Sequence, residues 1–465
     1  MKKIDIGKKE IIHFVGIGGI GMSGLAQIMK MMDFKVQGSD LSMNKNIENC
    51  KKIGIKFFLN HKKNNLRNAT IIVKSSAIKS NNIELIEAKS KKIPIYDRAE
   101  MLANVIAFKK NIIVTGSHGK TTTTSLISKI LSEAKLDPTI INGGVINSIR
   151  NNAKFGNGEW AVIEADESDG SFLKLPINFS VITNLDYEHL DYYKSFEKLE
   201  KSFLQFLNKT PAIGKSIICL DDKKIKKIVK KSKIKNYFTY GFNRLSNCQI
   251  LNVQYFQDKS KFDIKIKEGR KKTEFIKNIN LNLLGDYNIL NAAAAISVCC
   301  NLGVSMKIIK NALKKFTGVD RRMTKIFTNK KNEYYDDYAH HPTEISSVLK
   351  GIKDFSKKRK IISIFQPHRY SRIKNLYLEF SKCFFDSSTV LLCPIYSAGE
   401  KKDFDYSQTA FAKSIAKFSK VQVIIIKDKK ELFKYLKKNL LSDEIIIGMG
   451  AGSISQWMRE LKDNL

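Results

Sequence analysis

The sequence has little that would support a disulfide framework or a zinc site. Its seven cysteines are odd in number and scattered through 465 residues, and only Cys299 and Cys300 are adjacent. No CxxC pair occurs, so the ligand spacing of a zinc site is missing as well. The cysteine pattern favours a reducing compartment, and we expect the protein to be cytoplasmic.

Acidic residues are too few to balance the basic ones, with 45 Asp and Glu against 81 Lys and Arg and a net charge of +36. Such a surplus is one mark of nucleic-acid binding. However, only 11 of the 81 are arginine, and the abundance of Lys, Ile and Asn indicates an AT-rich coding sequence. The lysine run over 223–235 has amphipathic spacing, which favours a solvated helix face over a polyanion-binding patch. No aromatic-basic RNA motif occurs, so we expect no nucleic-acid partner.

A convincing membrane span is also missing. The segment 11–29 lacks charge, but it holds five glycines and His13 and does not resemble a cleavable signal. The uncharged segment 287–306 contains three asparagines and a run of alanines, which predicts a buried helix. We therefore expect no membrane partner and two to four ordinary globular domains.

Short, β-branched runs alternate with stretches of helical length along the whole chain. Near-continuous apolar strands separated by helices predict parallel sheets covered on both faces, hence an α/β fold with ligands at the carboxyl ends of strands. Candidate boundaries near 105 and 322 divide the chain into 1–105, 106–322 and 323–465. We expect the segment 245–280 to form strands at a domain edge. The predicted strands cover 11–17, 70–76, 111–117, 160–166, 179–185, 361–367, 389–395 and 444–450.

Two glycine-containing loops follow predicted strands. The first, GIGGIG, places Gly16, Gly18 and Gly21 in a GxGxxG pattern, which lets a diphosphate approach the backbone at a helix N-terminus. The second, TGSHGKTTTT over 115–124, resembles a P-loop although Val114 replaces the first glycine. Since the first motif alone would suggest a nicotinamide oxidoreductase, the presence of both is informative: it predicts two phosphorylated ligands, one of them ATP.

Polar residues gather at three further places. EADESDGSF (164–172) and TNLDYEHLDYY (183–193) place carboxylates and His189 after strands, where Mg²⁺ is commonly held near a P-loop. GDYNILNAAAA places Asn288 and Asn291 on one helix face, as an adenine contact or as core packing. Four of the scarce arginines, Arg321, Arg322, Arg369 and Arg372, lie in GVDRR and FQPHRYSR, where a planar fork can bind carboxylate or phosphate.

Together these blocks resemble the Mur ligases over essentially the whole chain. HFVGIGGIGMSGLA, SSAI, EADESD, DDYAHHPTE and FQPHRYSR are most similar to the branch that joins L-alanine to UDP-N-acetylmuramate. The resemblance implies a Rossmann-like N-terminal domain, a central P-loop ATPase-type domain and a Rossmann-like C-terminal domain. It also implies ligation to the lactyl carboxylate through an acyl phosphate in peptidoglycan precursor synthesis, with ATP and Mg²⁺ (or Mn²⁺).

The resemblance assigns roles to individual residues. It implies catalytic roles for Lys120, Glu164, His189, Arg321 and His340, and metal binding by Thr121, Glu164 and His189. The residues matched to UDP-sugar binding are Gly16, Gly18, Gly19, Gly21, Asp40, His61, Ser75 and Ser76. Those matched to ATP are Gly116, Ser117, His118, Gly119, Lys120, Thr121, Thr122, Asn288, Asn291 and Arg321. Those matched to the amino acid are His340, Arg369 and Arg372.

Three alternatives remain open at this point. Within the ligases, a murein peptide ligase or a folate-type ligase would use a peptide or glutamate in place of free alanine. A nicotinamide oxidoreductase rests on the first glycine motif alone. A basic ATPase stimulated by polynucleotides rests on the net charge and the P-loop, and it predicts steep salt dependence.

Overall fold

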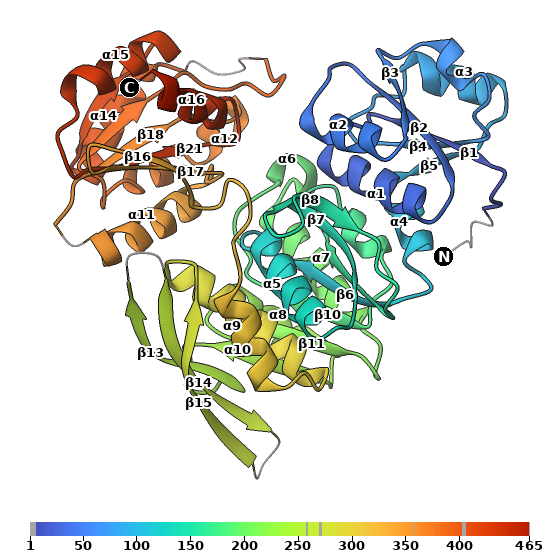
Figure 1. Ribbon diagram of the computed structural model, residues 1–465, viewed down its shortest axis with the longest axis horizontal. Coiled ribbons are helices and arrows are strands. Elements are labelled where there is room, and N and C mark those ends of the chain that lie inside the picture. The colour runs from blue at the N-terminus through green and yellow to red at the C-terminus, as the bar shows by residue number, and fades with distance from the viewer. Residues whose placement is uncertain (1–5, 257–258, 269–271, 357, 402–405, 465) are drawn as a thin grey trace. The chain divides into compact units, whose positions relative to one another are not determined.

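The computed structural model describes residues 6–256, 259–268, 272–356, 358–401 and 406–464. Contacts divide the chain into two compact units. Unit 1 comprises Met1–Val253, Phe262–Leu281 and Leu290–Thr317, and unit 2 comprises Gln254–Lys261, Asn282–Ile289 and Gly318–Leu465. The elements of both are labelled in Figure 1.

Unit 1 begins with a five-stranded parallel sheet in the order β3-β2-β1-β4-β5. Its strands β1 and β4 consist mainly of Ile, Val and Phe, most of them buried, as expected for a parallel sheet covered on both faces. The strands are β1 (Ile11–Val15), β2 (Lys35–Asp40), β3 (Lys56–Leu59), β4 (Ile71–Lys74) and β5 (Ile95–Asp97). The helices are α1 (Ile20–Met31), α2 (Lys45–Lys52), α3 (Ile83–Ser90) and α4 (Arg98–Val105).

A ten-stranded sheet follows, in the order β15-β14-β13-β12-β11-β10-β6-β9-β7-β8. Its central strands are parallel, and the β7–β8 pair is antiparallel. The strands are β6 (Lys110–Thr115), β7 (Thr139–Ile146), β8 (Asn151–Lys154), β9 (Trp160–Glu164), β10 (Phe179–Ile182), β11 (Lys215–Cys219), β12 (Tyr237–Gly241), β13 (Cys248–Tyr255), β14 (Ser260–Glu268) and β15 (Lys272–Leu281). The helices are α5 (Lys120–Glu133), α6 (Leu190–Tyr193), α7 (Phe196–Asn208), α8 (Lys223–Lys231), α9 (Asp286–Asn301) and α10 (Met306–Lys314).

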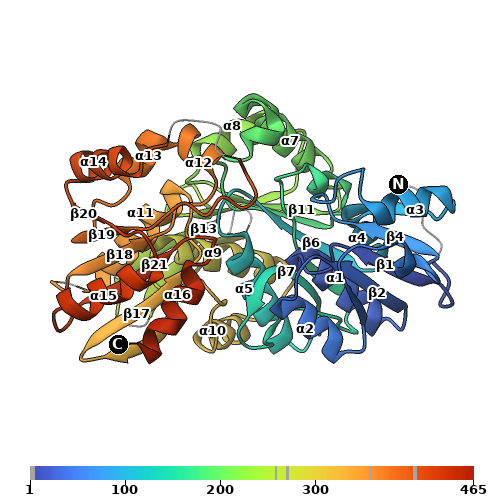
Figure 2. The same ribbon diagram turned by 90° about the horizontal axis from the view of Figure 1, so that it is seen from above.

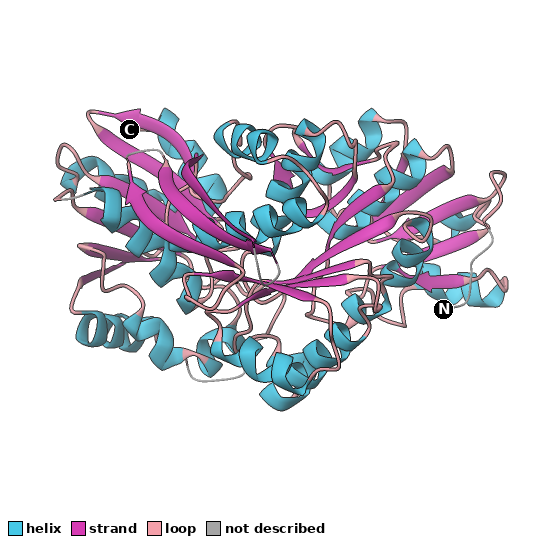
Figure 3. Cartoon of the chain, turned by 90° about the horizontal axis from the view of Figure 1, so that it is seen from below, coloured by secondary structure: helices cyan, strands magenta, loops and turns pink. Residues whose placement is uncertain are grey.

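Unit 2 is built on a six-stranded sheet in the order β16-β17-β21-β18-β19-β20, antiparallel only at β16–β17. Helices lie on both sides of its strands (Figure 3), and α13 lies beside α14 (Figure 2). The strands are β16 (Thr324–Asn329), β17 (Asn332–Asp337), β18 (Ile361–Phe365), β19 (Thr389–Leu392), β20 (Gln422–Ile425) and β21 (Ile445–Met449). The helices are α11 (Pro342–Ser356), α12 (Tyr370–Asn375), α13 (Tyr377–Lys382), α14 (Gln408–Ser419), α15 (Lys429–Asn439) and α16 (Ile454–Glu460).

These elements confirm the secondary structure that the sequence predicts. Each of the eight predicted strand segments contains or overlaps a strand. The segment 245–280 forms β13, β14 and most of β15, which lie together at one end of the large sheet, so the strands expected there are present. The lysine run forms α8, which buries Ile225 and Ile228 and keeps its lysines at the surface. The side chain of Asp222 caps this helix by accepting from the backbone N–H groups of Lys224 and Ile225.

Segment 287–306 largely forms the buried helix α9, as predicted. Among the helices of the described segments, none combines the length and apolar character that a membrane span requires.

Candidate functional site

The first glycine loop joins β1 to α1 in a tight turn. Gly16 has a φ of +83°, a conformation that L side chains rarely adopt. Its N–H and that of Ile17 donate to the carbonyl of Ser39, at 2.9 and 3.0 Å. Gly19 is the N-cap of α1 and has no side chain to bond the first turn, which also lacks acidic residues. The turn thus has the backbone form that accommodates a diphosphate at a helix N-terminus.

Most of the residues matched to the sugar nucleotide surround this turn. The Oδ2 of Asp40 accepts from the N–H of Gly18 at 2.8 Å, so this carboxylate closes the turn. Ser75 follows β4, and its Cβ lies 3.3 Å from where a Cβ on Gly16 would stand. Ser76 is the next residue and is exposed. A polar contact with Ser39 fixes the ring of His61, whose Nδ1 lies 2.9 Å from Ser39 Oγ.

The second loop follows β6 and opens α5. Gly116 and Gly119 have φ values of +130° and +82°, which explains why glycine stands at both positions. The loop is fixed by the segment after β10: the N–H of His118 donates to Asn184 Oδ1 at 2.8 Å, and Thr183 Oγ1 donates to the carbonyl of His118 at 2.6 Å. Thr183 and Asn184 had no predicted role, although both belong to the TNLDYEH block.

Lys120 is the first residue of α5 and points back into the loop. Its Nζ donates to the carbonyls of Gly116 and Ser117 at 2.6 and 3.2 Å, and lies 3.0 Å from Glu167 Oε1. Burial alone would lower the pKa of Lys120, but the nearby carboxylates of Glu167 and Asp166 raise it above its usual value. Lys120 therefore stays charged in a largely buried place, as a lysine that binds phosphate must.

Acidic residues lie in two places beside the second loop, Gly116–Lys120, which we call the phosphate loop. Thr121 Oγ1 donates to Glu164 Oε1 at 3.0 Å, and the N–H of Gly143 donates to the other oxygen of Glu164. His189 lies with its Nε2 3.7 Å from Glu167 Oε1, in a group whose ligand atoms, with one from Asp166, all lie within 4.8 Å of one another. The structure thus pairs Thr121 with Glu164, and it places His189, the third residue matched to the metal, beside Glu167.

Glu167 is the residue of this region that the sequence reasoning left without a role. Its side chain is fully buried, and its Oε2 has no hydrogen-bond partner among the described residues. Burial first, and then the charges of Asp166 and Glu188, raise its pKa to about 7, although Lys120 opposes the shift. An unpartnered buried oxygen beside an imidazole and a carboxylate fits a divalent cation, which takes oxygen ligands.

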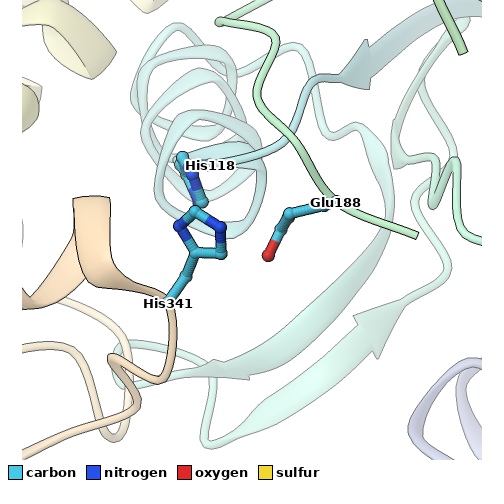
Figure 4. Close-up of side chains that lie close together, drawn as sticks. All are labelled: His118, Glu188 and His341. Carbon is cyan, nitrogen blue, oxygen red and sulfur yellow. The ribbon is translucent and has the colours of Figure 1, made fainter. Parts of the chain in front are cut away.

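The TNLDYEH segment supplies further polar groups to the loop. His118 Nε2 lies 3.3 Å from Asp186 Oδ2, and Glu188 is 9% exposed. Figure 4 shows the side chains of His118 and Glu188, which come from the phosphate loop and from the strand exit after β10. The figure also labels His341, a residue of unit 2 at the start of α11.

The predicted adenine pair lies on α9, and both side chains are buried. Asn291 Oδ1 accepts from Thr123 Oγ1 at 3.2 Å, and a Cβ on Gly119 would lie 2.3 Å from that oxygen. Asn288 Nδ2 donates to the carbonyl of Leu284 at 2.8 Å. The amide of Asn291 therefore packs directly against the phosphate loop, a contact that the sequence did not predict.

Arg321 in unit 2 is held from three sides. One of its terminal nitrogens donates to the carbonyl of Gly450 at 2.7 Å, and its Nε lies 3.9 Å from the buried Asp336. Its guanidinium lies over the ring of Tyr338, 4.8 Å from the centroid. The side chain of His340 turns back to the carbonyl of Tyr338, at 2.9 Å from Nδ1.

The residues predicted to bind the amino acid lie close to His368 in unit 2, a residue to which the sequence analysis assigned no role. His368 accepts from Arg372 through Nδ1 at 3.2 Å, and its ring lies 5.8 Å from that of His340. Burial and the neighbouring charges of His340, Arg372 and Arg369 lower the pKa of His368 to about 3, so it is a neutral acceptor. The position of His368 in FQPHRYSR, beside the two arginines, could have indicated from the sequence that it belongs to this site.

Comparison with known proteins identifies the family. Residues 11–110 match the model of the Mur ligase family catalytic domain, residues 114–299 that of the Mur ligase middle domain, and residues 321–452 that of the Mur ligase glutamate ligase domain. A UDP-N-acetylmuramate–L-alanine ligase of Pelagibacter ubique is 54% identical over 99% of both chains. The chain belongs to the Mur ligase family. It is therefore a ligase of α/β fold with three family domains, and the oxidoreductase alternative is excluded.

Further relatives agree with this assignment. The corresponding ligase of Bartonella bacilliformis is 40% identical over 98% of this chain and 96% of its own length. Among solved structures, the UDP-N-acetylmuramate–alanine ligase of Thermotoga maritima superposes with a TM-score of 0.81 at 27% identity, covering 97% of this chain and 98% of its own. A murein peptide ligase of Psychrobacter arcticus, at 21% identity over 98% of both chains and a TM-score of 0.72, shares the fold.

The contact between Gly119 and Asn291 generates a prediction. In Gly119→Ala, the added methyl would clash with the Asn291 oxygen, and the positive φ would add strain of about 1–2 kcal/mol. We expect ATP affinity, measured by calorimetry, to fall by more than about tenfold. Gly303→Ala is the matched control, because Gly303 has a φ of +79° but open space around it. Equal affinities for the two variants would show that the clash does not shape the loop.

Proposed function

We propose that this chain is the ATP-dependent ligase that joins L-alanine to the lactyl carboxylate of UDP-N-acetylmuramate in peptidoglycan precursor synthesis, and releases ADP and phosphate. One observation carries the proposal: unit 1 contains a diphosphate-type glycine turn and, separately, a phosphate loop with a charged, buried lysine. The extended identity to the Pelagibacter ubique ligase, 54% over 461 residues, supports this choice of substrates.

The chemistry requires activation of the acid. A carboxylate does not accept an amine at neutral pH, because its leaving oxygen is too basic. The lactyl carboxylate therefore attacks the γ-phosphorus of ATP, the bond from that phosphorus to the bridging oxygen breaks, and ADP leaves, which gives an acyl phosphate. Lys120 neutralises charge on the transferring group. The amine of L-alanine then attacks the acyl carbon, and phosphate leaves with the oxygen that it took from the carboxylate.

Mg²⁺ or Mn²⁺ is the proposed cofactor. Thr121, Glu164 and His189 are the ligands that we propose for it, and the unpartnered oxygen of Glu167 makes that residue a further candidate. When bound, the cation supplies charge stabilisation to the phosphates of ATP. Thr121 and Glu164 already lie 3.0 Å apart, and they therefore present two oxygens at one place.

The remaining ATP contacts are also proposals. We assign the phosphates to the loop from Gly116 to Thr122, the adenine to Asn288 and Asn291, and a phosphate contact to Arg321. Asn291 supports its assignment by its position against Gly119.

The amino-acid site is proposed to lie in unit 2. Arg372 and Arg369 would bind the carboxylate of L-alanine, and His340 would orient the amine or take its proton. Arg369 has a φ of +68° and lies 3.8 Å from Glu400, which also accepts from the hydroxyl of Ser371. A strained backbone fixed in this way is typical of a residue held for function.

The proposal assigns sugar nucleotide, ATP and amino acid to 1–105, 106–322 and 323–465, and places the reaction in the cytoplasm. A murein peptide ligase of the same family is the second candidate, since that fold also matches. The two candidates differ in the amine that they join to UDP-N-acetylmuramate, and one assay separates them.

That assay measures phosphate release with ATP, UDP-N-acetylmuramate and L-alanine, each omitted in turn. We expect phosphate release only with all three present, because phosphate leaves the acyl phosphate when the amine of L-alanine attacks it. Replacement of alanine by a free murein peptide should give no release. Turnover with the peptide and none with alanine would favour the second candidate, and dependence on polynucleotides would favour neither.

Lys120→Ala tests the separation of the two phosphate sites. Loss of the lysine should reduce turnover by about three orders of magnitude, since the charge on the transferring group is no longer balanced. Affinity for UDP-N-acetylmuramate, measured by calorimetry, should change by less than about twofold. Lys129→Ala serves as the control, because Lys129 lies on the same helix and pairs with Glu133, four residues further along. Equal loss of both properties would mean that the domains are assigned wrongly.

Arg372→Lys tests the amino-acid site. Lysine keeps the charge but loses the planar fork, so the KM for L-alanine should rise by about tenfold while kcat changes little. The exposed Arg67 offers a remote control as Arg67→Lys. An unchanged KM for L-alanine would remove Arg372 from the site.

A further inference from the structure

Glu84 is a buried carboxylate to which neither the motifs nor the proposed function give a role. It lies in the first turn of α3, and none of its surface is exposed. Burial alone would raise its pKa, but hydrogen bonds from His13, Ser39 and Asn65 lower the pKa below its usual value. The donors around its two oxygens are Ser39 Oγ at 2.6 Å, Asn65 Nδ2 at 2.6 Å, His61 Nδ1 at 3.1 Å, His13 Nε2 at 3.3 Å and Lys62 N at 3.3 Å.

The neighbours of His13 determine which of its ring nitrogens carries the proton. Gln37 Nε2 donates to the carbonyl of Asn65 at 2.9 Å and lies 3.2 Å from His13 Nδ1. An amide nitrogen is a donor only, so His13 Nδ1 accepts and the ring carries its proton on Nε2. His13 therefore donates to Glu84 and is fixed on both sides.

His61 is oriented by the same carboxylate. The hydroxyl of Ser39 donates to Glu84, so its oxygen can accept from His61 Nδ1, 2.9 Å away. Both Ser39 and Glu84 thus require the His61 proton on Nδ1, which leaves Nε2 as the nitrogen for an external ligand. His61 is also the ring nearer to solvent, with 9% of its side chain exposed against none for His13.

Ser39 connects this network to the glycine turn. Its backbone carbonyl accepts from the N–H groups of Gly16 and Ile17, and the next residue, Asp40, accepts from the N–H of Gly18. The side chain that Glu84 holds and the backbone that shapes the diphosphate turn therefore belong to one residue. The imidazole that Glu84 orients therefore lies beside the strand end that shapes the turn.

We infer that Glu84 is a positioning residue of the sugar-nucleotide site, which fixes His61 with its Nδ1–H inward so that Nε2 contacts the UDP moiety. The inference deepens the proposed function and rests on it for the identity of the ligand. The orientation of His61 itself does not depend on any ligand.

Nitrogen NMR of the wild-type protein, labelled in its seven histidines, tests that orientation directly. We expect His61 to carry its proton on Nδ1 in the free protein, with His61→Gln used to assign its signal. The preference should weaken in Glu84→Gln, where an amide replaces one accepting oxygen. A wild-type His61 protonated on Nε2 overturns the inference, whether or not the proposed substrate is right and whether or not the variant folds.

Kinetics test the consequence. Glu84→Gln should raise the KM for UDP-N-acetylmuramate about tenfold and leave kcat and the KM for ATP within about twofold. In a His61→Ala background the same change should add little, because the two residues act through one contact. Glu87→Gln is the matched control: it lies three residues further along α3 and pairs with Lys91 at 3.0 Å. A fall in kcat at constant KM, or fully additive effects, would contradict a positioning role.

Discussion

The rest of the site depends on one interaction, the ion pair that the buried ammonium group of Lys120 forms with Glu167. The charge of Lys120 is sustained by Glu167 at 3.0 Å and by neighbouring carboxylates, in a place where burial alone would favour the neutral form. A lysine kept charged in a low-dielectric site interacts strongly with phosphate, because water does not screen it. The phosphate loop, its glycines and the segment after β10 together hold this one nitrogen in position.

Much of this arrangement could be predicted from the sequence, since its causes are local. Apolar runs such as those of β18 and β21 predict buried parallel strands. Gly16 and Gly119 have backbone conformations that other residues rarely adopt. Polar residues directly after such strands must meet at one sheet edge, so the pairing of Thr121 with Glu164 was predictable. The family resemblance supplied the substrate names, which local patterns do not carry.

The remainder depends on contacts between residues far apart in the sequence. No spacing rule brings Asn291 against Gly119, the ring of His368 against that of His340, or Glu84 against His61. Each of these polar groups is buried or half-buried and is defined by which donors surround it. That information appears only once the strands and helices have packed.

The transfer of an oxygen atom tests the central claim that the lysine-bearing loop delivers a phosphoryl group to the sugar nucleotide. UDP-N-acetylmuramate labelled with heavy oxygen in its lactyl carboxylate would be turned over with ATP and L-alanine, and the released phosphate analysed by mass spectrometry. The account predicts one heavy oxygen atom in each phosphate, because the acyl carbon–oxygen bond breaks. Phosphate without the label would contradict an acyl phosphate and with it the role given to Lys120.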